Sequence, residues 1–129
     1  MKKILIILLL FNLSYCNVYS IEPKVFVQST VNRASDVLNN SSSKKEKINQ
    51  LKIIASENVD IRGIGFYTLG SFRKNLNQNQ KNQYLILFEK YFLKSFSSRL
   101  AEYTNPKINV ISENIINKNY TIVSSLLIS

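Results

Sequence analysis

The 129-residue chain contains no histidine and no tryptophan, and its single cysteine is Cys16, near the N-terminus. Histidine is the usual general base and a common metal ligand, and thiol enzymes need a cysteine thiolate. The eight acidic residues are scattered, and no two have the spacing of a paired-carboxylate site. These absences predict a protein that is not an enzyme and that holds no metal or cofactor.

Glycine is also scarce, with three residues in the whole chain. Gly63-Ile64-Gly65 lacks the third glycine of a dinucleotide-binding loop, and no predicted strand precedes it, so we expect no phosphate-binding loop. Each of these two glycines costs a helix about 1 kcal/mol relative to alanine. The pair reflects either the close approach of another backbone or ligand, or a relaxed composition.

Residues 1–20 have the layout of a cleavable secretory signal peptide. Two lysines precede an apolar run from Ile4 to about Leu13, and Val18 and Ser20 suit cleavage after Ser20. The run is shorter than the ~20 residues of a membrane-spanning helix. The alternative is lipidation at Cys16, although Tyr15 stands where that processing requires a small residue. Either reading predicts an exported protein.

The chain is basic, with a formal net charge of +9 that falls to +7 once Lys2 and Lys3 leave with the signal peptide. A basic exported protein fits anionic lipid headgroups better than nucleic acid. We therefore expect no nucleic-acid partner. The alternative is that the lysines simply solvate the surface.

Residue spacing predicts three helices in the first half of the mature chain. Pro23 suits the first turn of a helix whose apolar face comprises Val27, Val31, Ala34 and Leu38. Ser43 and Glu46 have the spacing of a capping box for a second helix, which turns inward Ile48, Leu51, Ile54 and Ala55. Asp60 is expected to cap a third helix that Gly70 ends.

The central feature is a long helix predicted over residues 79–103. Its apolar residues cover about 260° of the helix circumference; they are Tyr84, Leu85, Ile86, Leu87, Phe88, Tyr91, Phe92, Leu93, Phe96 and Leu100. The narrow strip left for water holds Gln83, Lys90, Lys94, Ser97 and Ser98. Such a helix must be covered on two sides, either by protein alone or by protein and an apolar ligand.

After Pro106 the apolar pattern changes to the two-residue period of β-structure. One strand starts at Lys107, Asn117-Lys118-Asn119 form a turn, and Tyr120 to Ile128 form a second strand. A two-stranded sheet is marginally stable alone, so we expect further strands to be missing and the domain of residues 21–129 to be C-terminally incomplete.

An ordered set of residues runs from Asp60 through Leu69-Gly70, Phe72-Arg73 and the elbow 77–80 to an aromatic helix that ends near Tyr103. This order resembles the MlaC family of periplasmic phospholipid-binding proteins, also called toluene-tolerance or ABC-transporter auxiliary proteins. Phe72 replaces the family's usual tryptophan, and an asparagine replaces the threonine of the elbow. Family members continue with further strands and a closing helix that complete a lipid cavity.

The resemblance implies an α+β fold with N-terminal helices, including the long aromatic helix, packed on a small antiparallel sheet of which only the first two strands are present. It implies a periplasmic shuttle that carries phospholipid between an outer-membrane lipoprotein complex and an inner-membrane ABC transporter complex, maintaining outer-membrane lipid asymmetry. The lipid-binding candidates are Leu69, Phe72, Arg73, Tyr84, Phe88, Phe92, Phe96 and Tyr103.

Several alternatives remain open at this stage. Each aromatic candidate could serve core packing instead, and Arg73, the candidate for headgroup contact, could be a surface or structural arginine. The whole chain could be an exported basic module that binds a partner or an anionic membrane surface without a cavity. It could also be a nonfunctional truncated remnant.

Overall fold

The computed structural model describes residues 21–128, which form four α-helices, a 3-10 helix and a two-stranded antiparallel sheet. In chain order these are α2 (Pro23–Asn39), α3 (Lys44–Asn58), α4 (Ile61–Thr68), η1 (Gly70–Lys74), α5 (Gln78–Leu100), β1 (Lys107–Asn117) and β2 (Tyr120–Ile128). The predicted α+β class is confirmed. The predicted signal peptide, with Cys16, lies outside the described residues.

The starts of α3 and α4 are fixed by side chains that accept hydrogen bonds from free backbone N–H groups. The Ser43 hydroxyl accepts from the Glu46 N–H at 3.3 Å, and the Glu46 carboxylate accepts from the Ser43 N–H at 2.9 Å. The Asp60 carboxylate accepts from the Gly63 N–H at 2.9 Å. The predicted capping box and the predicted Asp60 cap are both confirmed, so local sequence sets where these helices begin.

α5 begins and ends close to its predicted bounds. Asn77 and Gln80 exchange side-chain and backbone hydrogen bonds of 2.9 and 3.0 Å in a second capping box, so the elbow asparagine does cap. The helix ends at Leu100, three residues earlier than predicted. Asn105 then adopts a left-handed backbone with φ of 49°, immediately before Pro106, and this geometry redirects the chain into β1.

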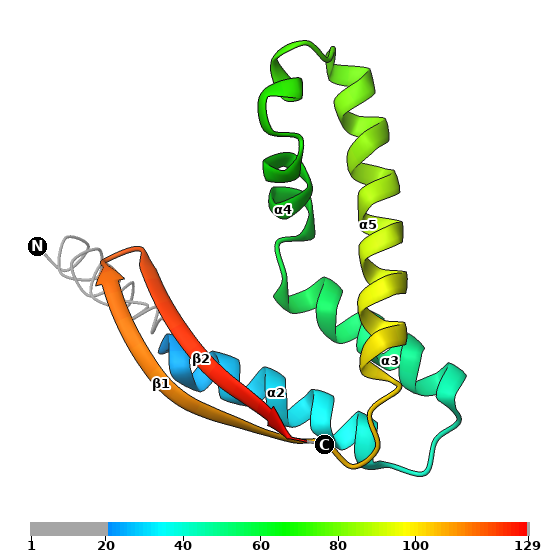
Figure 1. The fold of residues 1–129 in the computed structure, drawn as a ribbon, viewed down its shortest axis with the longest axis vertical. Helices are drawn as coiled ribbons and strands as arrows, with labels where there is room; N and C mark the ends of the chain where they lie inside the picture. Colours follow the sequence, from blue (N-terminus) through cyan, green and yellow to red (C-terminus); the bar gives the residue numbers. More distant parts are fainter. Residues whose placement is uncertain (1–20, 129) are drawn as a thin grey trace, which may run out of the picture.

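The elements form two parts that meet where α3 crosses α5 (Figure 1). In one part, α2 lies along the β1–β2 hairpin and packs against β1. In the other, α4 and η1 lie beside the first half of α5 and form with it an arm that extends away from the hairpin. We call residues 61–88 the arm.

The main core lies where α2, α3 and the end of α5 meet. Its buried residues are Val37 and Leu38 of α2 and Leu51 and Ile54 of α3, with Ala34, Leu100 and Ala101 packed against them. An ion pair of 2.8 Å between Arg33 and Glu57 also links α2 to α3, but both side chains are about half exposed. Because exposed ion pairs contribute little, apolar burial holds this junction together.

The arm is held together by a close approach of α4 to α5 at Gly65. A Cβ added there would lie 2.7 Å from Cδ1 of Phe88 and 3.1 Å from Cδ2 of Leu85. No side chain larger than hydrogen fits at that distance without a shift of its neighbours. The predicted close approach at Gly65 is therefore made by the side chains of Phe88 and Leu85 and not by another backbone or a ligand.

The hairpin has the predicted strands and the predicted turn. β1 and β2 pair antiparallel from Lys107 opposite Ile128 to Asn117 opposite Tyr120, with register shifts on β1 between Val110 and Ser112 and near the turn. The Asn117 side chain accepts a 2.9 Å hydrogen bond from the Asn119 N–H, which stabilises the turn. Among the helices, α2 makes the closest packing on the sheet, mainly against β1.

One detail of the predicted α5 surface is wrong. Ser97, placed in the water-facing strip, is fully buried, whereas Leu87 and Tyr91 are 65% and 70% exposed. The Ser97 hydroxyl has no hydrogen-bond partner among the described residues. α3 packs on α5, and a side chain as small as serine permits a close helix crossing. A nearly uniform apolar helix does not indicate from its periodicity which side a neighbour will cover.

Candidate functional site

An apolar cavity of about 200 Å³ lies where the two parts of the molecule meet. α2, α3, α5 and β1 all contribute to its wall. The lining residues are Thr30, Val31, Ala34, Leu51, Ile54, Ala55, Val59, Phe96, Leu100 and Ile108. The cavity therefore depends on packing between segments that lie up to 78 positions apart in the sequence, from Thr30 to Ile108.

Thr30 is the single polar residue of that wall, and its hydroxyl is already engaged. Its Oγ1 lies 3.0 Å from the backbone oxygen of Phe26 and 3.3 Å from Oδ1 of Asn58, both acceptors. The wall thus offers no charged group and no free polar side chain. Such a lining suits hydrocarbon and disfavours a polar ligand, because buried polar groups without partners cost free energy.

A line of stacked rings leads away from the cavity along α5. We call Tyr84, Phe88, Phe92 and Phe96 the aromatic stripe, since they recur at every fourth residue on one face of the helix. Successive ring centroids are 6.0, 6.1 and 5.5 Å apart with interplanar angles of 28°, 27° and 10°. Phe96 belongs to both the stripe and the cavity wall, so the two features join there.

The two ends of the aromatic stripe have different surroundings. Tyr84 is tied to α4 by a 2.8 Å hydrogen bond between its hydroxyl and that of Thr68, and Phe88 packs over Gly65. These two rings therefore hold the arm together. Phe96 is 40% exposed and faces the cavity, so it is the stripe residue best placed to meet a ligand.

The other predicted candidates lie away from the cavity. Leu69 is buried within the arm, and Phe72, on η1, is 73% exposed. The guanidinium carbon of Arg73 lies 5.5 Å from the ring centroid of Phe66. Tyr103 borders a second, more polar hollow of about 190 Å³ between the α2–α3 connection and the end of α5. The structure thus brings together the four aromatic stripe residues, whereas Leu69, Phe72, Arg73 and Tyr103 do not line the cavity.

Comparison with known protein families shows the family of this chain. The family model described as MlaC protein matches residues 28–129, which is most of the chain and all of the elements from α3 onward. The chain belongs to the MlaC family. The curated proteins and the solved structures give no significant match.

MlaC proteins are periplasmic phospholipid-binding transport proteins, and the family is not one of enzymes. Within residues 21–128 no three His, Cys, Asp or Glu residues are grouped to hold a metal ion. Among the helices of this same stretch, none is long and apolar enough to cross a membrane.

For this MlaC chain, residue spacing predicted that part of the cavity wall is covered, but it did not predict the cavity. Val31, Ala34, Leu51, Ile54 and Ala55 had been placed on inward helix faces, but as core residues. Their periodicity shows that they are covered, not whether a neighbour fills all the space beside them. Val59 and Ile108 carried no local signal that could have placed them beside α5.

Proposed function

We propose that this chain is a periplasmic phospholipid carrier, which moves lipid between an outer-membrane lipoprotein complex and an inner-membrane ABC transporter complex. The observation that carries the proposal is the apolar cavity with Phe96 in its wall and the aromatic stripe leading from it. Signal-peptide cleavage after Ser20 would deliver the protein to that compartment.

The chemistry of the cavity supports an acyl chain as its occupant. Each methylene transferred from water to an apolar site gains about 0.8 kcal/mol, so a carrier needs a wall without competing polar groups. Thr30, the one polar lining residue, has its hydroxyl engaged by Phe26 and Asn58. An acyl chain is therefore a ligand that this wall can bind without leaving a buried polar group unpaired.

The size of the cavity adds a condition on how lipid enters. Pockets that enclose drug-sized ligands span about 300–1,000 Å³, whereas this cavity measures about 200 Å³. It has room for a segment of one acyl chain and not for two whole tails. We therefore propose that the cavity widens beside Phe96 when lipid enters.

The test is lipid uptake by the protein purified from cells that export it. Native mass spectrometry should find co-purified phospholipid, and the delipidated protein should take up lipid from vesicles. Phe96→Ser should weaken uptake at least about tenfold, which corresponds to about 1.4 kcal/mol. Tyr91→Ser is the matched control, because Tyr91 is 70% exposed on the same helix and outside the aromatic stripe.

A folded protein that carries no lipid and takes none from vesicles would exclude the carrier function. Equal losses of lipid uptake in Phe96→Ser and Tyr91→Ser would instead show that the aromatic stripe is not part of the site. Far-ultraviolet circular dichroism of both variants separates loss of binding from loss of the fold.

A further inference from the structure

The arm has a surface composition unlike that of the rest of the molecule. Residues 61–88 carry four cationic residues, Arg62, Arg73, Lys74 and Lys81, and no acidic residue. By contrast, residues 21–60 carry six cationic and five acidic residues, and residues 89–129 carry five and three. More than half of the mature chain's net charge of +7 therefore lies on the arm.

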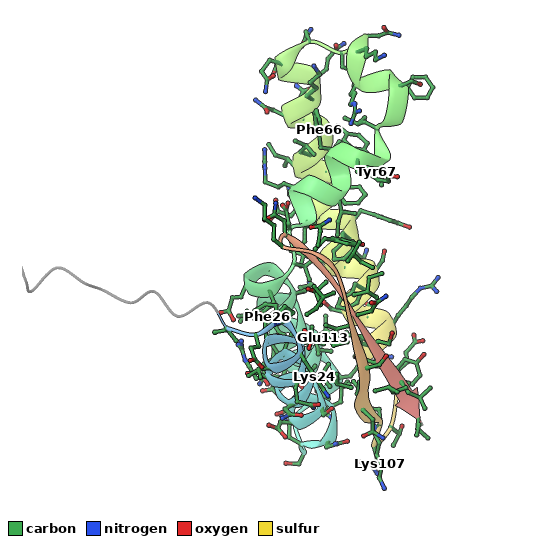
Figure 2. All side chains as sticks on the ribbon, turned by 90° about the vertical axis from the view of Figure 1, so that its left-hand side faces the viewer. Lys24, Phe26, Phe66, Tyr67, Lys107 and Glu113 are labelled. Atoms are coloured by element: carbon green, nitrogen blue, oxygen red, sulfur yellow. The ribbon has the colours of Figure 1, made fainter. Side chains whose placement is uncertain are left out.

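The same segment exposes aromatic rings near its free end. Phe66, Tyr67 and Phe72 are 40%, 80% and 73% exposed. They occur within seven residues, on α4 and on η1, and η1 lies at the end of the arm that is farthest from the hairpin (Figure 1). Figure 2 shows Phe66 and Tyr67 on the arm, well separated from Phe26 near the start of α2.

Arg73 connects the charge to the rings. Its guanidinium carbon lies 5.5 Å from the centroid of the Phe66 ring, within the range of a cation–π contact. This contact places a cation directly beside an exposed aromatic face. Neither Arg73 nor Lys74 forms an ion pair among the described residues, so both charges are available to an external anion.

We propose that the end of the arm docks on the surface of a bilayer that contains anionic phospholipid. Tyrosine concentrates at the headgroup level of membranes, phenylalanine lies on the apolar face of segments that bind there, and lysine and arginine reach to the phosphates. The absence of acidic residues on the arm removes repulsion from such a surface. Docking would bring the carrier to its lipid source, and it depends on surface residues that the cavity does not use.

A protein partner fits the end of the arm less well than an anionic bilayer does. A protein partner would need acidic residues opposite Arg73 and Lys74 and a pocket for Phe72, whereas an anionic bilayer supplies both a charged layer and an apolar interior. The hairpin also exposes apolar residues such as Ile111 and Ile115, but Lys107, Glu113 and Lys118 give it mixed charge.

The experiment measures binding of the exported protein to sedimented vesicles of phosphatidylcholine alone and of phosphatidylcholine mixed with phosphatidylglycerol. We expect binding to the mixed vesicles that weakens with added salt, since salt screens surface charges. Because one basic residue near an anionic surface is worth about fivefold in binding, Arg73→Gln/Lys74→Gln should weaken it about 25-fold.

Lys44→Gln/Lys45→Gln is the matched control. It removes the same charge from the exposed first turn of α3, at the far end of the molecule from η1 (Figure 1). α5, which has 23 residues and is about 34 Å long, separates the two sites by several screening lengths of about 8 Å. We expect the control to bind nearly as the unchanged protein does.

A tryptophan probe adds a local readout, because the sequence contains no tryptophan. Phe72→Trp should shift its fluorescence to shorter wavelength with mixed vesicles, and Tyr120→Trp, at the hairpin turn, should not. Equal binding to both kinds of vesicle, no binding to either, or equal loss in the two charge variants would overturn the proposal. Lipid uptake measured in the same samples reports on the cavity, so failure of docking and failure of the carrier function remain distinguishable.

Discussion

Filling the apolar cavity is the sharpest test of what it holds, and Ala34→Leu is the substitution best suited to it. Ala34 lies in the cavity wall, is half-buried and also packs against the main core. Leucine adds three carbon atoms to that wall. Since a water molecule occupies about 30 Å³ in the liquid, three groups of similar size fit within a cavity of about 200 Å³.

The expected magnitudes follow from the buried carbon atoms. Three additional carbons at about 0.8 kcal/mol each give about 2.4 kcal/mol, and the lost rotamer freedom of leucine offsets about 0.5–1 kcal/mol. The free energy of unfolding of the lipid-free protein should therefore rise by about 1.5 kcal/mol. The same three carbons exclude about three methylenes of the ligand, so affinity for phospholipid should fall roughly 50-fold.

Chemical denaturation measures the first quantity, and titration with vesicles measures the second. Asn32→Leu is the matched control, because Asn32 is exposed on the same helix and lies outside the cavity wall. It should change the free energy of unfolding by no more than about 0.5 kcal/mol and leave affinity intact. If Ala34→Leu bound phospholipid as tightly as the unchanged protein, the cavity would not be the site. If it lowered the free energy of unfolding instead, the cavity would not be free space.

Three further predictions concern the arm and the cap of α3. Gly65→Ala should lower the free energy of unfolding by about 1–3 kcal/mol through overpacking on Phe88. Chemical denaturation of Gly65→Ala/Phe88→Leu should show that part of this free energy is recovered. Stabilisation by Gly65→Ala would refute the close contact. Tyr84→Phe removes a 2.8 Å hydrogen bond to α4 and should cost about 0.5–1.5 kcal/mol by the same assay, whereas no change would make that bond dispensable. Hydrogen bonds from Ser43 lower the pKa of Glu46 below its ordinary 4.5, so its contribution is complete above that value and is lost as the pH falls through the lower folded pKa. Acid denaturation of Glu46→Gln should lack this component, and identical pH profiles would contradict the sign.

Local sequence was sufficient for most of the secondary structure because the correctly predicted boundaries have short-range causes. The 3-10 helix η1 and the end of α5 at Leu100 were not predicted. Ser43 and Glu46 bond to each other's backbone within one turn, and the Asp60 carboxylate accepts a hydrogen bond from the Gly63 N–H. Pro106 stands directly before β1. The change of apolar period after Pro106 likewise marked both strands. The MlaC resemblance rested on the order of such features, and the family match confirms it.

Tertiary structure decided what lies beside each apolar face. The four-residue spacing of the aromatic stripe places its rings on one side of α5, but it does not say that Tyr84 bonds to α4 while Phe96 borders a cavity. Likewise, the polarity of Ser97 predicted exposure, whereas the folded protein buries its side chain fully.

The sequence by itself thus determined the helices, the strands and the family, because hydrogen bonds within a few residues and the periodicity of apolar side chains specify them. The cavity wall and the separation of the arm from the hairpin were decided by tertiary structure. Both depend on packing between segments such as Val31 on α2 and Ile108 on β1, and packing is a property of shapes that meet in space rather than of residues that are neighbours in the chain.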